Sequence, residues 1–302
     1  MDSGQRSDMS GNRPRLGFIG LGIMGTPMAL RLLDQGWSVT AWNLEPERLA
    51  PAVACGARAA ADPGEVARAS DIVLLCVLDA HAVEACVFGP QGVAAHARHG
   101  TLLVDHSTIP PEATRDFATR LVDRAGMHWI DAPVSGGPLQ ARNGTLTIMA
   151  GGESAAIERA RPVMSDLAAN FTHMGPVGAG QTAKVINQAI VGAGFVLMAE
   201  ALTLAERAGI AAAELPACLA GGLADSALLQ KVYTQMQARD FEPPRGYARQ
   251  LLKDLDAVLA FSEGLELDLP LVRAAAARYA EYVARGQGLS DTASIVRLYE
   301  GK

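Results

Sequence analysis

Three glycines in the pattern GxGxxG constrain the fold of this chain more than any other feature. They follow the apolar run Leu16–Ile19 and open a segment with helical periodicity that extends to about Gln35. In such a turn the first glycine permits a tight bend, the second lets a pyrophosphate approach the backbone, and the third lets helix pack on strand. An ordinary glycine-rich turn is the alternative. We predict a dinucleotide-binding loop made of Gly20, Leu21, Gly22, Ile23, Met24 and Gly25.

The residues after the next predicted strand favour one class of dinucleotide only weakly. The run Ser38–Trp42 ends about 20 residues after the glycine loop, where the adenine ribose of a bound dinucleotide lies. Asn43 stands where an acidic residue would bind the ribose hydroxyls of NAD, and Leu44 offers no charge to a 2′-phosphate. Glu45 would oppose that phosphate, whereas Arg48 would partly compensate. The cofactor is therefore NAD(H) or NADP(H), with a weak preference for NAD.

The order of apolar segments predicts an α/β fold followed by a helical domain. From Arg15 to about Gly175, short β-branched runs alternate with Ala-rich helical stretches, as in a doubly wound parallel sheet with helices on both faces. After Gly175, Ala, Leu and Glu recur at helical spacing, and a long interdomain helix is predicted over about 179–208. We expect a flexible leader over residues 1–13, a Rossmann-type domain over 14–176, and a helical substrate and dimerisation domain over 177–302.

Composition excludes several classes of protein. A formal net charge of −6 gives no basic excess for nucleic acid. No stretch of about 18 uninterrupted apolar residues predicts a membrane span, and residues 1–13 are polar, unlike a signal peptide. The four cysteines have no CxxC spacing, and no HExxH pattern or carboxylate cluster predicts a metal. We expect a cytoplasmic protein with metal-independent chemistry, bound to neither nucleic acid nor membrane.

Three segments together make the sequence recognisable. They are Gly20–Gly25, Asp131–Gly137 and Gly180–Gln188, and in this order and spacing they resemble the β-hydroxyacid dehydrogenase family from Arg15 onward. The resemblance implies a Rossmann domain, a helical dimerising domain, and hydride transfer between a nicotinamide and a small hydroxyacid or aldehyde acid. Asn187-Gln188 and the segment Asn143–Leu146 are more similar to the branch that reduces 2-hydroxy-3-oxopropionate (tartronate semialdehyde) than to the 3-hydroxyisobutyrate branch.

Lys184 is the predicted general acid/base. Reduction of an aldehyde places negative charge on the carbonyl oxygen, and an ammonium within hydrogen-bond reach stabilises that charge and donates the proton. Asn187 lies three residues further on, hence on the same helix face, and would orient the substrate. Ser135, Gly136 and Gly137 form a turn whose backbone amides can converge on an anion, and the resemblance implies that they hold the substrate carboxylate. The alternatives are a solvated lysine, a helix-to-helix hydrogen bond and a plain glycine turn.

Further cofactor contacts are expected where strands end and on a later helix. Val77, Leu78 and Asp79 end or follow the apolar run at 71–77, and Thr108 follows the run at 101–107, at the edge where cofactors bind. Thr108 would bond the nicotinamide or its ribose, or else cap a helix before Pro110. Asp79 replaces a proline that the family usually has. Lys253 precedes Asp254 as in the family's lysine–aspartate pair near the nicotinamide, with Tyr247 as the nearest upstream aromatic residue; a surface charge is the alternative.

Four functions compete, and the partners follow from them. The first is reduction of 2-hydroxy-3-oxopropionate; 3-hydroxyisobutyrate oxidation needs the same residues. Imine reduction is disfavoured because relatives of that kind often lack the lysine, and a non-catalytic dinucleotide-binding module is disfavoured because Lys184 and Asn187 are both present. The expected partners are a small carboxylate substrate and further copies of the chain, as a homodimer or homotetramer through the helical domain.

Overall fold

A computed structural model describes residues 13–300 of the chain. The chain divides into two compact units, Met1–Lys184 and Val185–Lys302, and the boundary falls inside one long helix. Of the leader expected over residues 1–13, residues 1–12 lie outside the described part. Arg13 is described, and its guanidinium donates a hydrogen bond to the carbonyl oxygen of Gln35 at 2.8 Å.

The first unit is built on one sheet with the strand order β3-β2-β1-β4-β5-β6-β8-β7, and β9 pairs with β8. Strands β1 to β6 pair in parallel, β8 is antiparallel to both β6 and β7, and β8 and β9 are parallel. The predicted doubly wound sheet is confirmed. The strands are β1 (Leu16–Ile19), β2 (Val39–Trp42), β3 (Arg58–Ala59), β4 (Ile72–Leu75), β5 (Leu102–Asp105), β6 (His128–Asp131), β7 (Val134–Ser135), β8 (Leu146–Gly151) and β9 (Ala168–Gly175).

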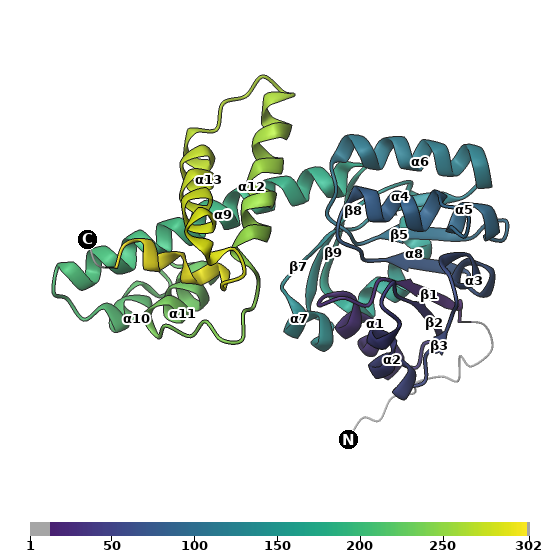
Figure 1. Ribbon diagram of the computed structural model, residues 1–302, viewed down its shortest axis with the longest axis horizontal. Coiled ribbons are helices and arrows are strands. Elements are labelled where there is room, and N and C mark those ends of the chain that lie inside the picture. The colour runs from purple at the N-terminus through teal and green to yellow at the C-terminus, as the bar shows by residue number, and fades with distance from the viewer. Residues whose placement is uncertain (1–12, 301–302) are drawn as a thin grey trace. The chain divides into compact units, whose positions relative to one another are not determined.

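Helices cover both faces of this sheet (Figure 1). They are α1 (Gly25–Asp34), α2 (Ala50–Ala54), α3 (Pro63–Ala69), α4 (Ala80–Phe88), α5 (Val93–His96), α6 (Pro111–Ala125), α7 (Pro138–Asn143) and α8 (Ser154–Leu167), with a short 3-10 helix η1 (Pro46–Leu49). Strands β1, β4 and β5 are buried along their whole length, as expected for strands covered on both faces.

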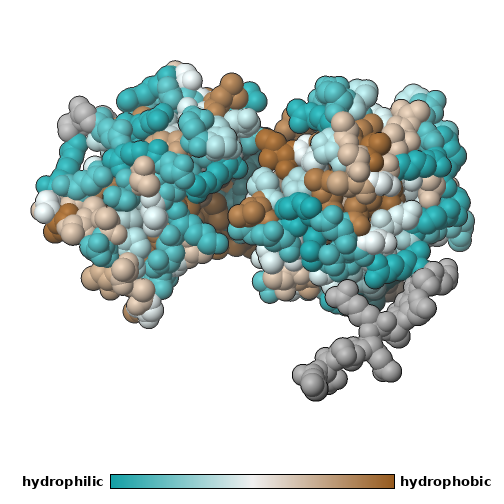
Figure 2. Space-filling view, turned by 90° about the horizontal axis from the view of Figure 1, so that it is seen from below, coloured by the Kyte–Doolittle hydropathy of each residue, from teal (hydrophilic) through white to brown (hydrophobic). Residues whose placement is uncertain are grey.

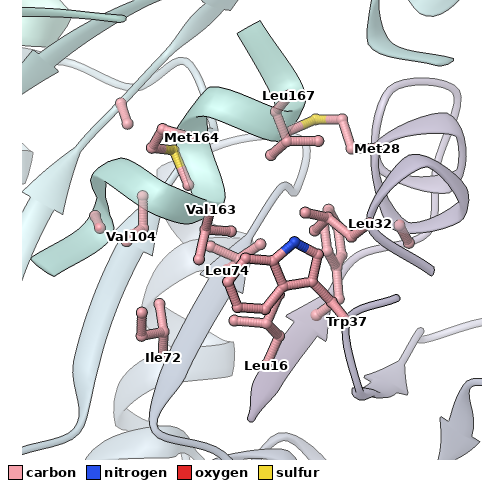
Figure 3. Packing of buried hydrophobic residues seen from close by; sticks show 14 of the residues in the cluster. Leu16, Met28, Leu32, Trp37, Ile72, Leu74, Val104, Val163, Met164 and Leu167 are labelled. Carbon is pink, nitrogen blue, oxygen red and sulfur yellow. The ribbon is translucent and has the colours of Figure 1, made fainter. Parts of the chain in front are cut away.

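Two apolar cores result, one on each face of the sheet. The first joins α1, α2 and α8 to the strands; Figure 3 shows Met28 and Leu32 of α1 facing Val163 and Leu167 of α8, with Trp37 packed among them. The second core lies under α3, α4 and α6 and uses the alternate residues of the same strands. In Figure 2 hydrophilic residues cover much of the surface, with apolar patches on the sheet-containing unit.

Three strands have no counterpart among the runs expected from the sequence. Strands β3 and β7 are only two residues long, too short for an alternating pattern to be visible. Strand β9 is eight residues long, but most of its residues are exposed, so it lacks the apolar alternation that marks a half-buried strand. The expectation of a parallel sheet is thus correct for β1 to β6 and wrong at the β7–β8 edge.

The second unit is helical in its described residues, as predicted, apart from turns and one isolated β-bridge between Tyr247 and Asp291. Helix α9 (Ala179–Arg207) ends before Gly209, which has a φ of +71°, within two residues of the predicted end. By length and composition α9 is also apolar enough to cross a membrane. The remaining helices are η2 (Ala212–Glu214), α10 (Leu215–Leu219), η3 (Leu228–Tyr233), α11 (Thr234–Gln237), α12 (Ala248–Glu263), α13 (Pro270–Tyr282), η4 (Val283–Gln287) and η5 (Thr292–Leu298). Their apolar faces enclose one core with α9.

Candidate active site

The carboxyl ends of the parallel strands bring most of the predicted site residues to one edge of the sheet. The chain runs from β1 outward to β3, then returns to β4 on the other side of β1 and continues to β6. Ligands of such sheets bind where the strand order reverses, here beside β1 and β4. The glycine loop follows β1, Asn43 follows β2, Val77–Asp79 follow β4, and Thr108 follows β5.

The glycine loop has the close packing that a phosphate-binding turn requires. Gly20 has a φ of +95°, and a Cβ there would lie 2.2 Å from the carbonyl oxygen of Cys76 at the end of β4. A Cβ on Gly25 would lie 1.9 Å from the carbonyl oxygen of Gly20. A Cβ on Gly22 would meet nothing within 4 Å, so that the backbone there faces open space.

The N-terminus of α1 fits an anion. No side chain caps it, and its first turn contains no acidic residue. The backbone N–H groups of a helix's first turn carry partial positive charge and lack partners within the helix. With Gly22 open to solvent, residues 20–25 can accommodate the pyrophosphate of a dinucleotide.

Asn43 links the glycine loop to the segment after β2. Its Oδ1 accepts a hydrogen bond from the backbone N–H of Leu21 at 2.6 Å. Its Nδ2 donates to the backbone oxygen and to Oε2 of Glu45, at 3.1 and 2.8 Å. Asn43 is buried, whereas the Glu45 side chain is half exposed.

Ser107 ties the ends of β4 and β5 together. Its Oγ accepts from the N–H of Val77 at 3.0 Å, and its own N–H donates to Oδ1 of Asp105 at 2.9 Å. Asp79, in the position of the family's proline, caps α4 by accepting from the N–H of Ala82 at 2.9 Å. Thr108 is half-buried and does not cap α6, whose N-cap is Pro110.

The first turn of α9 is fixed to the sheet by two buried side chains. Oδ1 and Oδ2 of Asp131, at the end of β6, accept from the N–H groups of Gly178 and Gln181, each at 2.8 Å. The amide of Gln181 donates to the carbonyl oxygen of Ser107 at 2.7 Å and accepts from the N–H of Ile109 at 3.3 Å. A buried carboxylate at a helix N-terminus satisfies N–H groups that the helix cannot. The start of α9 is therefore held against the ends of β5 and β6.

Lys184 is buried near this anchored helix start. Its side chain lies in α9, and its Nζ donates to the carbonyl oxygen of Val134 in β7 at 3.0 Å. Only 8% of the residue is exposed, which distinguishes it from the solvated lysine that was the alternative. The ammonium is therefore fixed next to the turn that follows β7.

The turn that follows β7 depends on its two glycines. Gly136 and Gly137 have φ values of +137° and +86°, which side-chain-bearing residues rarely adopt. Ser135 and Gly137 are half-buried, and Gly136 is exposed. The turn and Lys184 belong to the same unit, and Val134 directly precedes Ser135, so a cation and a set of backbone amides lie together.

The other predicted residues lie in the second unit. Nδ2 of Asn187 donates to Oε1 of Gln188 at 2.8 Å, and Nε2 of Gln188 donates to Oδ2 of Asp254 in α12 at 2.6 Å. The ammonium of Lys253 lies 3.7 Å from Oδ1 of Asp254. The alternative role considered for Asn187, helix-to-helix hydrogen bonding, is thus performed by its neighbour Gln188, which joins α9 to α12.

Two buried ionisable groups lie at the end of β5. Burial raises the pKa of Asp105 to about 7, against the effect of its hydrogen bonds from Ser107. Burial lowers the pKa of His106 to about 4, although its Nδ1 bonds the carbonyl oxygen of Ala132. Oδ2 of Asp105 and Nε2 of His106 have no hydrogen-bond partner among the described residues. Burial likewise raises the pKa of Asp131.

The sequence interpretation gave no role to Asp105, Asp131 or Gln181. All three are polar and fully buried. Asp105 and Asp131 each end an apolar strand, which is the one signal that could have marked them, because charged residues are rarely buried without a partner. Gln181 carries no such signal, since only the fold shows that it faces Ser107. Among residues 13–300, no group of three or more His, Cys, Asp or Glu side chains could hold a metal ion.

Comparison with known proteins gives consistent matches along the chain. Residues 15–175 match the NAD-binding domain of 6-phosphogluconate dehydrogenase, and residues 178–299 match the NAD-binding domain of NADP-dependent 3-hydroxyisobutyrate dehydrogenase. The chain is 38% identical to 2-hydroxy-3-oxopropionate reductase of Escherichia coli, over 95% of this chain and 97% of that one. It is 34% identical to 2-(hydroxymethyl)glutarate dehydrogenase of Eubacterium barkeri, over 95% of each.

A solved structure is similar along its whole length. The 3-hydroxyisobutyrate dehydrogenase of Mycobacterium tuberculosis, described with L-serine, superimposes with a TM-score of 0.87 at 29% identity, covering 96% of this chain and 100% of that one.

Proposed function

Because this chain belongs to the β-hydroxyacid dehydrogenase family, we propose that its own substrate is 2-hydroxy-3-oxopropionate, which it reduces at the aldehyde carbon. Family membership makes it an NAD(P)-dependent oxidoreductase that acts on hydroxyacids. The finer substrate is supported by the similarity to the Escherichia coli reductase and by Asn187-Gln188 and Asn143–Leu146. The nearest alternative substrate is 3-hydroxyisobutyrate.

The position of Lys184 carries the proposal. Its ammonium is 3.0 Å from the carbonyl oxygen of Val134, which directly precedes the Ser135–Gly137 turn. A substrate whose carboxylate is held by the amides of that turn would have its carbonyl oxygen near Lys184. The lysine would stabilise charge on that oxygen and deliver the proton, which contributes a factor of about 10²–10⁴ in rate. Asn187, one turn further along α9, would orient the substrate hydroxyl.

NAD(H) is the proposed cofactor, and the residues at the sheet edge would hold it. The amides of residues 20–25 would bind the pyrophosphate, Asn43 would lie at the adenine ribose, and the remaining contacts would come from Val77, Leu78, Asp79, Thr108 and Lys253. The bound nicotinamide supplies the hydride. Leu44, which is 76% exposed and uncharged, and Glu45 offer nothing favourable to a 2′-phosphate.

We propose that residues 14–176 bind the cofactor and that residues 177–302 contribute substrate specificity and dimerisation. Helix α9 exposes Ile186, Ile190, Leu197 and Leu204, each more than half accessible. Their spacings of 4, 7 and 7 residues put them on one face of the helix. A second copy of the chain is the proposed cover for this face, in a cytoplasmic homodimer or homotetramer.

A substrate panel tests the proposed function. Purified protein is mixed with 2-hydroxy-3-oxopropionate and either NADH or NADPH, and with 3-hydroxyisobutyrate and either oxidised cofactor, while absorbance at the nicotinamide band is followed. We expect the highest kcat/KM for 2-hydroxy-3-oxopropionate with NADH. A higher kcat/KM for 3-hydroxyisobutyrate would make that compound the substrate and leave the proposed hydride transfer unchanged. Cofactor binding without turnover of any hydroxyacid or aldehyde acid would contradict the proposal.

A further inference from the structure

The side chain of Asn43 accepts a hydrogen bond with its oxygen and donates with its nitrogen. It accepts from the N–H of Leu21 and donates to the carboxylate of Glu45. A carboxylate at position 43 could accept from Leu21 but would repel Glu45, and an apolar residue could do neither. Asn43 itself is 6% exposed, whereas the side chain of Glu45 is half exposed. The pair thus fixes Glu45 relative to the glycine loop.

The negative charge that is usual at the end of the second strand lies two residues later in this chain, on Glu45. In dinucleotide-binding folds an acidic residue at the end of the second strand binds the ribose hydroxyls of NAD and repels the 2′-phosphate of NADP. Here the strand-end residue is neutral, but its Nδ2 holds Oε2 of Glu45 at 2.8 Å. The carboxylate stands two residues later in the chain and is fixed by the strand-end side chain.

The carboxylate of Glu45 also forms an ion pair with Arg48. Nε of Arg48 lies 3.8 Å from Oε2 of Glu45. Arginine is the residue that best binds a phosphate, since its guanidinium offers paired N–H donors. A 2′-phosphate would have to compete with Glu45 for Arg48 and would be repelled by Glu45 itself.

We propose that Glu45, oriented by Asn43, is the residue that selects NAD(H) over NADP(H). This inference rests on the proposed cofactor preference and adds the residue responsible for it. Removing the charge at Glu45 both ends the repulsion and releases Arg48 for the phosphate. A second change, Asn43→Asp in the Glu45→Gln variant, places a negative charge at the strand end. The carboxylate at position 43 would then accept from the amide at position 45, the reverse of the wild-type pair.

Binding constants for both cofactors test the proposal without any turnover. The three tryptophans all lie in the first unit, and Trp42 directly precedes Asn43, so quenching of their fluorescence reports occupancy. Wild type, Glu45→Gln, Glu47→Gln and the double variant Asn43→Asp/Glu45→Gln are titrated with NADH and NADPH. Glu47 is the matched control, because it is exposed in the 3-10 helix that Glu45 precedes and its change removes the same charge.

We expect wild type to bind NADH at least about 10-fold more tightly than NADPH, in line with a charge contact of about 1.4 kcal/mol or more. Glu45→Gln is expected to remove most of that preference by strengthening NADPH binding, with NADH binding changed less than about threefold. Glu47→Gln should keep the wild-type ratio, and the double variant should restore it.

The contradicting results differ for the two proposals. Tighter binding of NADPH by the wild type would overturn the proposed cofactor preference. A wild type that prefers NADH, together with a Glu45→Gln variant whose ratio equals that of Glu47→Gln, would overturn only the assignment of Glu45.

Discussion

The two units of this chain depend on particular residues to very different degrees. In the sheet-containing unit, Gly20 and Gly25 are required because a Cβ would collide with backbone oxygen atoms at 2.2 and 1.9 Å. In the helical unit, a Cβ added to Gly192 or Gly194 would instead lie 2.5 or 2.4 Å from the side chain of Leu255 or Leu228. Backbone at the ends of buried strands cannot move aside, whereas a leucine can change rotamer. Functional motifs can therefore be recognised in the sequence where backbone atoms form the binding site, because only glycine fits at those positions.

The largest expected effect concerns the two lysines. Lys184 is buried and bonded to Val134 in the first unit, whereas the Lys253 side chain is half exposed in the second. Lys184→Ala should lower kcat by roughly 100-fold or more, because the proton donor is lost. Lys253→Ala should mainly raise KM for the cofactor. Steady-state kinetics and NADH titration of both variants measure this. Equal losses of kcat in the two variants would remove the distinction between the units.

Substitution of matched glycines tests the packing contrast. Gly25→Ala should lower the free energy of unfolding by about 3 kcal/mol, the upper end of the cost of overpacking, because the new methyl group meets a backbone oxygen. Gly194→Ala should change it by less than about 1 kcal/mol, since alanine also favours the helix. Urea unfolding is followed by tryptophan fluorescence for the first unit and by tyrosine near-ultraviolet circular dichroism for the second, where all five tyrosines lie. A more damaging Gly194→Ala would reverse the comparison.

Asp105 should make the sheet-containing unit respond to pH. Its pKa is raised to about 7 in the folded chain, so unfolding releases its proton, and its contribution to stability is present at low pH and lost as pH rises through 7. Asp105→Asn removes this loss. The stability of the variant relative to wild type should increase between pH 5 and 7 by up to about 1.4 kcal/mol per pH unit.

His106 has the opposite effect: its pKa is lowered to about 4, so its contribution to the free energy of unfolding falls as pH drops below the pKa it has in the unfolded chain. This contribution is present in both wild type and Asp105→Asn, so it cancels when their free energies of unfolding are subtracted. Urea unfolding at several pH values provides the measurement. A difference that does not vary with pH would mean that the Asp105 carboxyl ionises normally in the folded chain.

Two glutamines on α9 give the smallest contrast. Gln181 is fully buried and bridges Ser107 and Ile109, and Gln188 bonds the partly exposed Asp254. Gln181→Ala leaves buried backbone groups unpaired and should cost about 2 kcal/mol, whereas Gln188→Ala should cost about 1 kcal/mol. Gln181→Ala should also lower kcat by altering the start of α9. Equal losses of unfolding free energy in the two variants would contradict this contrast.

The sequence predicts the architecture of the first unit better than its individual strands and anchoring contacts. The glycine loop, the alternation of strands and helices and the end of α9 follow from local rules, since a tight turn needs positive φ and a buried strand needs apolar residues. Strand β9 is missed because its exposed residues carry no periodic signal. Gln181 and Asp131 are missed as anchors because their partners, which follow β5 or begin α9, are distant in sequence. The Gln188–Asp254 bond likewise joins residues that are 66 positions apart.

The most direct test of the central claim is to follow the hydride itself. Protein is incubated with 2-hydroxy-3-oxopropionate and NADH that carries deuterium at one or the other position of nicotinamide C4, and the product is analysed by mass spectrometry and NMR. The account predicts that deuterium from one of the two labelled forms appears on the former aldehyde carbon, one atom per product molecule, and that Lys184→Ala forms far less of this product. Product without deuterium from either form, or no product despite NADH binding, would contradict it.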